Sequence, residues 1–562
     1  MDSWQTNSWE YLQLSIDAEI KSLEELIRSL KHRRNALAPI SSLPTEVIST
    51  IFSILRESVA PSSLTIPTLI ENRDSDNLSW FHLSHVCHRW REIALNQPLF
   101  WNHLHFNNFS PAGAAEILAR ARMVPLHLKA RVLSHWNNAR FDAFQKEIRM
   151  HASHISHLDI SADFSRFSNV VEGLVSPAPI LEYLSLVCET LPDRDSEASS
   201  GVSVPDTLFD GTTPSLSYLK LRACDISWRS PLLKGLKCLE IYLPSASGRP
   251  SLSVWLDALD AMPQLQTLRL HEASPIALPA LPPSGIKRTI TLPFLSVLLF
   301  SASARDCVLA LAHLILPALT RLWIATISHL QDGSDVQEIL PYLSQHVREF
   351  QNTQKVVVRS DGISTKIVGS PRQIAFLDDM YPAPLTFSFR AQNWSTATRA
   401  AVLDATLAAL PLENLVSLTS QNYTDRFEKQ VWLHHAQRWP LLQYLFLSRS
   451  AARGFMEMFL EDNGVRGNPL LPSLTTLVLV GGELDARRTL LLCDALMNRV
   501  EQGVPLQVLD LKGCLVTDHT VHLLSEVVPV VHGPVKTIQQ SAQRISAWDD
   551  EARGFFVRAV PE

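Results

Sequence analysis

The residues with the greatest capacity for chemistry are four metal-capable side chains close together in the chain. They are His82, His85, Cys87 and His88. A structural zinc site needs four imidazole or thiolate ligands that converge on the ion. The chain has no C-x-x-C pair, and Cys87 falls on the apolar side of a helical pattern. We therefore predict that these histidines are polar surface residues, and we expect no metal.

Three further histidines, His151, His154 and His157, straddle the end of a predicted helix and the start of a predicted strand. They are also predicted to be polar surface residues. The sequence contains no G-x-x-x-x-G-K, no G-x-S-x-G, no H-E-x-x-H and no G-x-G-x-x-G, the motifs of phosphate, nucleophile, zinc and dinucleotide sites. We predict no enzyme activity and no cofactor.

The elements around these side chains are two helical patterns. In the later one, apolar residues at i, i+3, i+4, i+7, i+10 and i+11 predict one face of a single helix over 83–94. They are Leu83, Val86, Cys87, Trp90, Ile93 and Ala94. The earlier pattern opens with Pro44 and Glu46, which suit a first helical turn. Its apolar residues between positions 47 and 55 span a wider arc of the helix than one contact with the core needs. This width predicts that the helix has a second apolar surface, which another element or a partner covers.

Residues 39–101 contain these features in order: Leu-Pro, Glu, paired aliphatics and Ile-Phe, then L-x-x-V-C-H-R-W-R-E-I-A, then Pro-Leu-x-Trp. With this order of features the stretch resembles the F-box, of the fungal type. The segment 56–79 departs from the pattern because it is longer than the usual link between these helices. The resemblance implies a small all-α domain.

The resemblance also implies that this domain docks on a Skp-type adaptor of a cullin–RING ubiquitin ligase. The residues that match F-box positions at or near that contact are Leu43, Pro44, Glu46, Val47, Ile48, Ile51 and Phe52. Trp90, Leu99 and Trp101 are expected to hold the helices of the domain together.

A heptad pattern precedes this domain. Its apolar residues are Ile16, Ile20, Leu23, Ile27, Leu30 and Leu37. Charged side chains surround this seam, and Pro39 ends it. Two interpretations stay open: a coiled coil that forms a homodimer, or a single amphipathic helix that folds back on its own chain.

After residue 101 one short word recurs, Leu-x-x-Leu-x-aliphatic or Phe. It starts at Leu181, Leu216, Leu236, Leu265, Leu295, Leu319, Leu442, Leu474 and Leu506. This word resembles an irregular leucine-rich repeat. Each word predicts a short strand whose leucines cannot be buried alone, so neighbours stack into a parallel sheet with helices behind it.

The predicted fold class is α/β: an N-terminal heptad helix, an all-α F-box-like domain, and a repeat solenoid with parallel strands inside and helices outside. The predicted domains are 1–38, 39–106, 107–530 and a tail at 531–562. The regular recurrence of the word is interrupted at 350–410. An Asp-Gly hairpin, a strand and a helix that begins with a Ser/Thr cap are predicted there. We interpret this region as a degenerate repeat or an insertion.

Side chains that flank the apolar positions of each word point away from the core, because strand side chains alternate. They are predicted to line a concave substrate-binding face. The candidates are Tyr218, Arg222, Tyr242, Arg269, Arg321, Trp323, Tyr444 and Phe446. Tyr, Trp and Arg dominate binding hot spots, and the alternative for each aromatic is packing under a loop.

The composition narrows the class of partner. The net charge of −6 and the pI near 6.4 argue against nucleic acid, which favours a basic surface. Seven scattered cysteines fit free thiols in a reducing compartment. The first residues lack a signal-peptide pattern, and the apolar window 307–327 contains Arg321, so a buried helix plus a strand is expected there and no membrane span. We predict cytoplasmic or nuclear localisation.

These observations lead to one favoured function and two rivals. The favoured one is a substrate-recognition subunit of a Skp–cullin–F-box ubiquitin ligase, which binds the adaptor through the F-box and an unknown protein through the repeats. One rival is a non-catalytic scaffold without ubiquitin transfer. The other is an enzyme with its site in the region 350–410.

Overall fold

The computed structural model describes residues 3–59, 78–189, 202–245, 248–275, 288–346, 352–371, 383–422, 428–448, 450–462, 469–481, 484 and 486–533. The chain forms two compact units. The first unit comprises the described residues up to Tyr183 together with Thr212–Ser215. The second comprises Leu184–Gly211 and the described residues from Leu216 onward.

The first unit opens with one long helix, α1 (Ser3–Ala36). Five small elements of the F-box-like region follow it. They are η1 (Pro39–Ser42), α2 (Thr45–Val59), η2 (Leu78–His85), α3 (His88–Asn96) and η3 (Pro98–Phe100). Most of the predicted long link, 60–77, lies outside the described residues.

The prediction of a single helix over 83–94 is wrong. A 3-10 helix ends at His85, and α3 begins at His88 after Cys87, whose φ of −158° and ψ of 170° are extended. The physical reason is that apolar spacings of three and four residues also fit two short helices that share one face. The aromatic ring of Phe81 holds the first of them in place, with its centroid 5.6 Å from that of Trp101.

Three α/β pairs complete the first unit. Their strands are β1 (His103–His105), β2 (Leu126–Val132) and β3 (Ile155–Ala162), and their helices are α4 (Pro111–Ala121), α5 (Asn138–His151) and α6 (Phe164–Glu172). The strands pair in parallel with Leu104, Leu128 and Leu158 in register. All three leucines are buried, which places them in one core behind the strands.

The repeat words form strands, as predicted. These are β4 (Tyr183–Cys188), β6 (Tyr218–Arg222), β8 (Cys238–Tyr242), β9 (Thr267–His271), β11 (Val297–Ser303), β13 (Arg321–Ile327), β18 (Tyr444–Ser448), β19 (Thr476–Val480) and β20 (Val508–Asp510). Each begins two residues after the first leucine of its word, and that leucine is buried in every case. The first leucine thus anchors the turn into the strand.

Strands β6, β8, β9, β11 and β13 pair in that order, and every pair is parallel. The words align without offset, because Leu219, Leu239, Leu268, Leu298 and Leu322 share one register position across the five strands. Equivalent leucines therefore stack into a continuous core. This confirms the predicted parallel sheet, whereas the assignment to the leucine-rich repeats stays a prediction.

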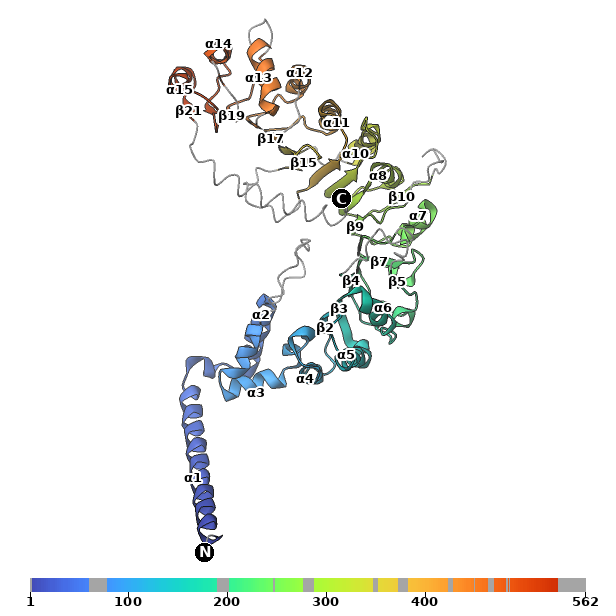
Figure 1. Ribbon diagram of the computed structural model, residues 1–562, viewed down its shortest axis with the longest axis vertical. Helices are drawn as coiled ribbons and strands as arrows, with labels where there is room; N and C mark the ends of the chain where they lie inside the picture. Colours follow the sequence, from blue (N-terminus) through green and yellow to red (C-terminus); the bar gives the residue numbers. More distant parts are fainter. Residues whose placement is uncertain are drawn as a thin grey trace. The chain divides into compact units, whose positions relative to one another are not determined.

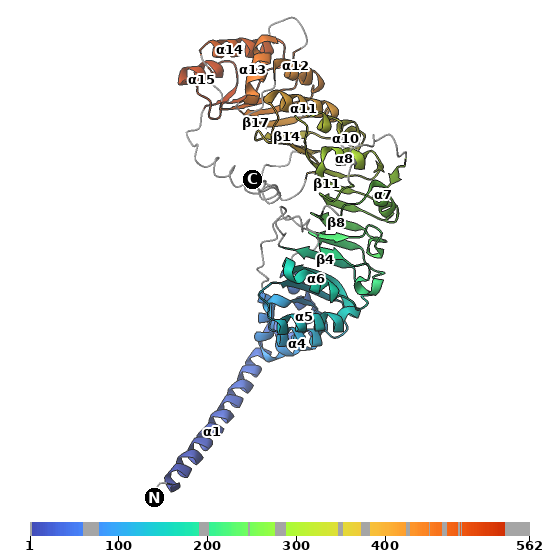
Figure 2. The same cartoon turned by 45° about the vertical axis from the view of Figure 1, so that its right-hand side comes forward.

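Helices cover one side of this sheet (Figures 1 and 2). They are α7 (Leu252–Asp260), α8 (Ala304–Leu311), α10 (Leu340–His346), α11 (Thr396–Ala409), α12 (Lys429–Arg438), α13 (Ser450–Asp462), α14 (Ala486–Glu501) and α15 (Asp518–Ser525). The apolar window 307–327 is the end of α8 followed by β13, as expected. In the described part of the chain, no helix is long and apolar enough to cross a membrane.

The irregular region continues the sheet in reversed strand order. Its strands are β14 (Lys355–Ser360), β15 (Ser364–Ser370), β16 (Leu385–Arg390) and then β17 (Ser417–Asn422). The spatial order is β13-β16-β15-β14-β17, with β15 antiparallel to both neighbours. The predicted hairpin turns at Gly362, whose φ is +93°, and Asp361 Oδ1 accepts from the Ser364 amide at 2.7 Å. The predicted cap of α11 is Ser395, which accepts from the Thr398 amide.

The last described elements extend the sheet. Strand β18 pairs with β17 and β19, β19 pairs with β20, and β20 pairs with β21 (Val530–His532), all in parallel. Helix α15 packs beside β21, so the apolar pattern at 521–528 belongs to a helix that covers the end of the array, as predicted. Almost all of the predicted tail lies outside the described residues.

Candidate functional site

Helix α2 has one buried face and one exposed apolar face. Ile48 and Phe52 are 1% and 0% exposed, whereas Val47 and Ile54 are 42% and 59% exposed. At 100° per residue the mean directions of these two pairs differ by about 130°, so they lie on different sides of the helix. Aliphatic side chains exposed in this way mark an interaction surface when they cluster. The wide apolar arc predicted for this helix therefore consists of a buried face that packs in the core and an exposed face that is free to bind.

Aromatic rings form the core under the buried face. The Phe52 ring lies 5.2 Å from Trp90 and 5.8 Å from Phe100, measured between centroids. Trp101 is 1% exposed, and its indole N–H donates to the Ala94 carbonyl at 2.7 Å. Edge-to-face aromatic pairs add to the free energy that burial provides. Trp90 and Trp101 thus hold the helices together, as expected.

The prediction for Leu99 is wrong, because this side chain is 52% exposed. The residue beside it, Phe100, is 1% exposed and takes the core position. In η3 only one side of the short turn faces the helices. The closing motif Pro-Leu-x-Trp therefore contributes its third and fourth residues to the core.

Arg89 fixes the start of α2 against α3. Its guanidinium donates to the Leu43 carbonyl at 2.6 Å and also to the Ser41 carbonyl. Hydrogen bonds from a charged donor are stronger than neutral ones. At the other end of α2, Arg56 donates to the His103 carbonyl of β1 at 2.8 Å, and burial lowers the pKa of Arg56 to about 10. The exposed face of α2 is thereby held on a rigid base.

The predicted adaptor-binding residues divide between these two faces. Pro44, Glu46 and Val47 are exposed, Leu43 and Ile51 are half-buried, and Ile48 and Phe52 are core residues. Sequence reasoning missed Ile40 and Ile54, which are 40% and 59% exposed. The signal for Ile54 was available, since it lies seven residues after Val47 and so two turns along the same face.

A comparison with protein families agrees with this arrangement of helices. Residues 40–107 match the F-box-like family. This stretch is an F-box-like domain. Such a domain implies binding to a Skp-type adaptor, and F-box proteins are adaptor-binding and typically non-catalytic members of ubiquitin ligase complexes. No curated protein matches the chain. The fungal type stays a prediction.

The histidines of the F-box-like domain do not converge. His82, His85 and His88 are exposed, and Cys87 is half-buried. Within the described ranges, no group of three or more His, Cys, Asp or Glu side chains is placed to hold a metal ion. All seven cysteines are free thiols, and four of them are buried: Cys188, Cys224, Cys307 and Cys514.

From the end of the F-box-like domain onward, three histidines of β1, β2 and β3 stack in register. The ring centroids of His103 and His127 are 4.2 Å apart, those of His127 and His157 are 3.9 Å apart, and Tyr183 follows at 5.7 Å. Burial lowers the pKa of His103 to about 3 and of His127 to about 4, with smaller effects from neighbouring cationic groups. These rings are therefore neutral at pH 7 and act as an aromatic ladder.

The prediction that the histidines at 151–157 are polar surface residues is wrong. His154 is 5% exposed, and His151 and His157 are half-buried. His151 Nδ1 lies 3.1 Å from His154 Nε2, so one ring donates a hydrogen bond to the other. The strand register that brings His157 against His127 was not visible in the local pattern.

In the second unit, the face opposite the leucine core carries a buried polar cluster around Glu240. The carboxylate is 1% exposed and forms an ion pair with Arg269 of the next strand. It also accepts from the Tyr218 hydroxyl at 2.7 Å and from the Tyr242 hydroxyl at 3.1 Å. Burial, the largest single effect, lowers the pKa of Arg269, but Glu240 together with Tyr242, Cys238 and Tyr218 outweighs it, so the pKa is raised overall. Three of the predicted substrate-binding residues therefore hold one carboxylate.

The predicted recognition residues form two groups. Six lie on the adjacent strands β6 to β13: Tyr218, Arg222, Tyr242, Arg269, Arg321 and Trp323. Tyr444 and Phe446 lie on β18, separated from the others by β16, β15, β14 and β17. All are half-buried except Arg269, which is 7% exposed. The first group is the more continuous surface.

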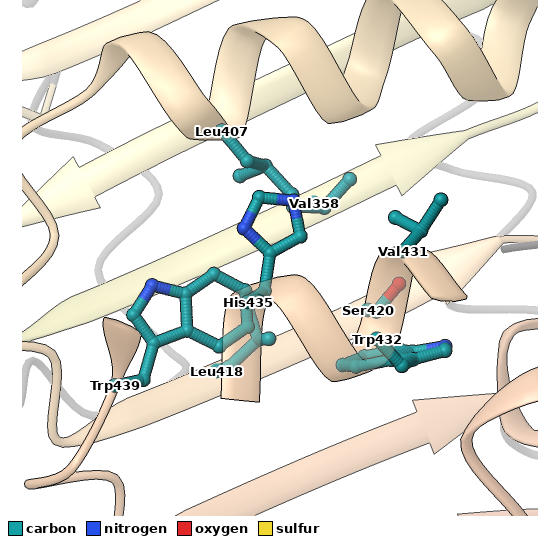
Figure 3. Close-up of a pocket in the computed structure, with 8 residues that line it drawn as sticks. All are labelled: Val358, Leu407, Leu418, Ser420, Val431, Trp432, His435 and Trp439. Carbon is teal, nitrogen blue, oxygen red and sulfur yellow. The ribbon is translucent and has the colours of Figure 1, made fainter. Parts of the chain in front are cut away.

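A small cavity lies where the irregular region meets α12 (Figure 3). Its lining residues are Val358, Leu407, Leu418, Ser420, Val431, Trp432, His435 and Trp439. Buried His435 stacks on Trp439 at 4.8 Å, and its Nε2 lies 2.7 Å from Asp404 Oδ1. The cavity measures about 10 Å³, about the room that one water molecule needs. It cannot hold a substrate, so it gives the enzyme hypothesis no support.

Proposed function

We propose that this protein is the substrate-recognition subunit of a Skp–cullin–F-box ubiquitin ligase. The observation that carries the proposal is the exposed apolar face of α2, within a domain of the F-box-like family. Val47, Ile51 and Ile54 lie on or beside this face, and Ile40 and Leu43 precede it. Burial of large apolar side chains at the centre of an interface is what makes binding hot spots.

The second half of the proposal is that the repeat face binds the protein to be modified. Its strongest support is the group of candidates on the adjacent strands β6 to β13, where β11 alone separates Arg321 and Trp323 of β13 from Arg269 of the Glu240 cluster. Arg and Trp are enriched at the centres of protein interfaces. We also propose that the protein acts in the cytoplasm or the nucleus. The repeats are proposed to be of the leucine-rich type.

In this function the chain performs no bond-making step. It supplies proximity, because holding the substrate beside the ligase converts a bimolecular encounter into an effectively unimolecular one. A polar cluster that is already paired, such as Glu240 with Arg269, suits a rigid recognition face better than a reacting group.

A scaffold that joins partners without ubiquitin transfer is the alternative. Two variants of the full chain separate the two functions: Arg321→Ala with Trp323→Ala on the repeat face, and Val47→Asp with Ile54→Asp on α2. Proteins captured by the wild type are identified by proximity labelling, and their ubiquitin conjugates are counted.

The proposed function predicts that the repeat-face variant loses specific neighbours, whereas the α2 variant keeps those neighbours but loses their ubiquitin conjugates. Met123→Asp is the matched control, because Met123 is an apolar residue of the first unit that is 72% exposed. The scaffold alternative is favoured if the neighbours carry the same ubiquitin signal in the wild type and the α2 variant.

A further inference from the structure

Helix α1 presents an apolar stripe that the described part of the chain leaves uncovered. Every side chain from residue 11 to residue 34 is exposed. The stripe consists of Ile16, Ile20, Leu23, Ile27 and Leu30, which are 49–54% exposed. An apolar stripe of this length on a monomer marks an interaction site. Near the end of the helix the ring of His32 lies beside that of His88 in α3, with centroids 6.2 Å apart. The stripe itself is exposed, so it gives no support to the alternative that α1 folds back on its own chain.

The spacing of the stripe specifies the shape of its partner. The apolar residues follow each other by four, three, four and three positions, with Ile20 and Ile27 at a positions and Ile16, Leu23 and Leu30 at d positions. Such a seam is covered by a second α-helix whose knobs repeat with the same period. The occupant is therefore a helix with a matching heptad.

Charge is segregated along α1. Up to residue 25 the helix carries five carboxylates and one cation: Glu10, Asp17, Glu19, Glu24, Glu25 and Lys21. From residue 26 to residue 36 it carries only cations: Arg28, Lys31, Arg33 and Arg34, with His32 between them. A partner helix of opposite direction and the same sequence brings the acidic half against the basic half.

We propose that α1 pairs with α1 of a second copy of this chain in an antiparallel coiled coil centred near residue 25. In antiparallel pairs an a residue packs against a d residue, so Ile20 faces Leu30 of the second copy and Leu23 faces Ile27. The e positions then pair Asp17 with Lys31 of the second copy. The g positions pair Glu19 with Arg33.

Each of these contacts occurs twice because the pair has two-fold symmetry, which gives four attractive flanking pairs and one repulsive pair, Glu24 with Glu24. In a parallel pair the g and e positions instead bring Glu19 against Glu24 of the other copy twice, and Lys31 and Arg33 gain no acidic partner. The flanking charges set orientation, whereas the apolar seam supplies most of the affinity.

The same sequence pattern explains why the occupant is a second copy. Asp17 and Glu19 stand at the same distances before residue 25 as Arg33 and Lys31 stand after it. The four central seam residues, Ile20 with Leu30 and Leu23 with Ile27, are also equidistant from residue 25. This antisymmetry is what a self-complementary two-fold interface requires. An unrelated partner helix would place no such requirement on α1.

The orientation fixes where the two F-box-like domains lie. Each follows the C-terminal end of α1, which is 11 residues from the centre of the pair. At a rise of 1.5 Å per residue, these two ends are about 33 Å apart. In a parallel pair the two ends would lie side by side.

The test measures the self-association of the full chain by sedimentation velocity with three variants. The first carries Asp17→Lys and Glu19→Lys, and the second carries Lys31→Glu and Arg33→Glu. The control carries Lys21→Glu and Arg28→Glu, which change the same number of charges at b positions outside the seam. All of these side chains are exposed, so the fold is retained.

The proposal predicts that the wild type and the control dimerise, that each of the first two variants dimerises at least tenfold more weakly, and that their mixture forms a heterodimer of wild-type strength. A parallel pair predicts the reverse for the first variant, whose dimer would be tighter because Glu19→Lys turns the repulsion from Glu24 into an attraction. A tighter dimer of that variant overturns the antiparallel orientation.

A wild type that stays monomeric at tens of micromolar overturns the second copy as the occupant. So does a dimer that survives Ile20→Asp together with Ile27→Asp, because that dimer uses another surface. Adaptor binding is measured on the same samples. It is independent of α1 pairing, so failure of the coiled coil and failure of the proposed ligase function are distinguishable.

Discussion

Arg89 of α3 donates a hydrogen bond of 2.6 Å to the carbonyl oxygen of Leu43 at the entrance of α2. Leu43 precedes the first turn of α2, and its side chain is half-buried at the edge of the exposed apolar face. The same guanidinium also meets the Ser41 carbonyl. A residue of α3 thus determines how the helix with the exposed apolar face begins.

Replacement of Arg89 should therefore weaken both the domain and its binding. Arg89→Ala leaves two carbonyls without their charged donor and should lower the free energy of unfolding by about 1–3 kcal/mol. Arg91→Ala, an exposed arginine of the same helix, is the control and should change stability by less than about 0.5 kcal/mol. Thermal unfolding and adaptor titration check both. Equal behaviour of the two variants would refute the role of Arg89.

The buried and exposed faces of α2 should separate stability from binding. Phe52→Ala removes a fully buried ring between Trp90 and Phe100 and should cost about 3–5 kcal/mol of folding free energy. Ile54→Ala removes an exposed side chain and should leave the unfolding temperature nearly unchanged while it weakens adaptor binding. Chemical denaturation of both variants is the measurement. A large loss of stability in Ile54→Ala would place this residue in the core after all.

The ion pair of Glu240 and Arg269 should behave as a coupled unit. Arg269→Met leaves a buried carboxylate with only hydroxyl donors, and removal of one partner of a buried pair costs about 3–5 kcal/mol. The double variant Glu240→Leu with Arg269→Met should be more stable than Arg269→Met alone. Lys237→Met, an exposed position just before β8, is the control. Additive losses in denaturation would show that the two side chains do not interact.

The histidine ladder should make the first unit sensitive to acid. The folded pKa of His127 is about 4 because the ring is buried and lies against His157, whereas an unfolded histidine has a pKa of about 6.5. The unfolded state thus binds the proton more tightly, so this stability is complete above pH 6.5 and falls as the pH drops toward 4. The slope is at most about 1.4 kcal/mol per pH unit for one proton.

His127→Phe keeps a ring in the stack but removes its titration. It should flatten the fall of the unfolding temperature between pH 6.5 and 4, whereas His135→Phe, at an exposed position, should leave the slope of the wild type. The measurement is the unfolding temperature as a function of pH. An unchanged slope in His127→Phe would show that other groups cause the acid sensitivity.

Much of the fold followed from local pattern. Each word located a strand, which begins two residues after the first leucine. The pattern repeats because one buried leucine at the turn and two on the strand are a repeated physical requirement. The same alignment could have found the Glu240 cluster, since Lys220, Glu240 and Arg269 all lie four residues after the first leucine of their words. Register then places them on neighbouring strands.

Other features depend on contacts between distant segments, which local pattern does not encode. The reversed spatial order of β14, β15 and β16 is one such feature, because the sequence of each strand has the same pattern whichever strands lie next to it. The break at Cys87 is another, since the apolar positions on both sides share one face. On α2, helical spacing identified apolar positions, but it did not show which of them are buried. That Phe52 is buried and Ile54 exposed depends on which side of the helix Trp90 packs against.

The measurement that tests the central claim most directly is the affinity of the full chain for a purified Skp-type adaptor by isothermal titration. The wild type should bind, and Val47→Asp with Ile54→Asp should bind at least about 100-fold more weakly, since two hot-spot residues contribute about 2 kcal/mol or more each. Its unfolding temperature should match that of Met123→Asp, which should bind as the wild type does. A wild type that does not bind the adaptor, or an α2 variant that binds with wild-type affinity, would contradict the account.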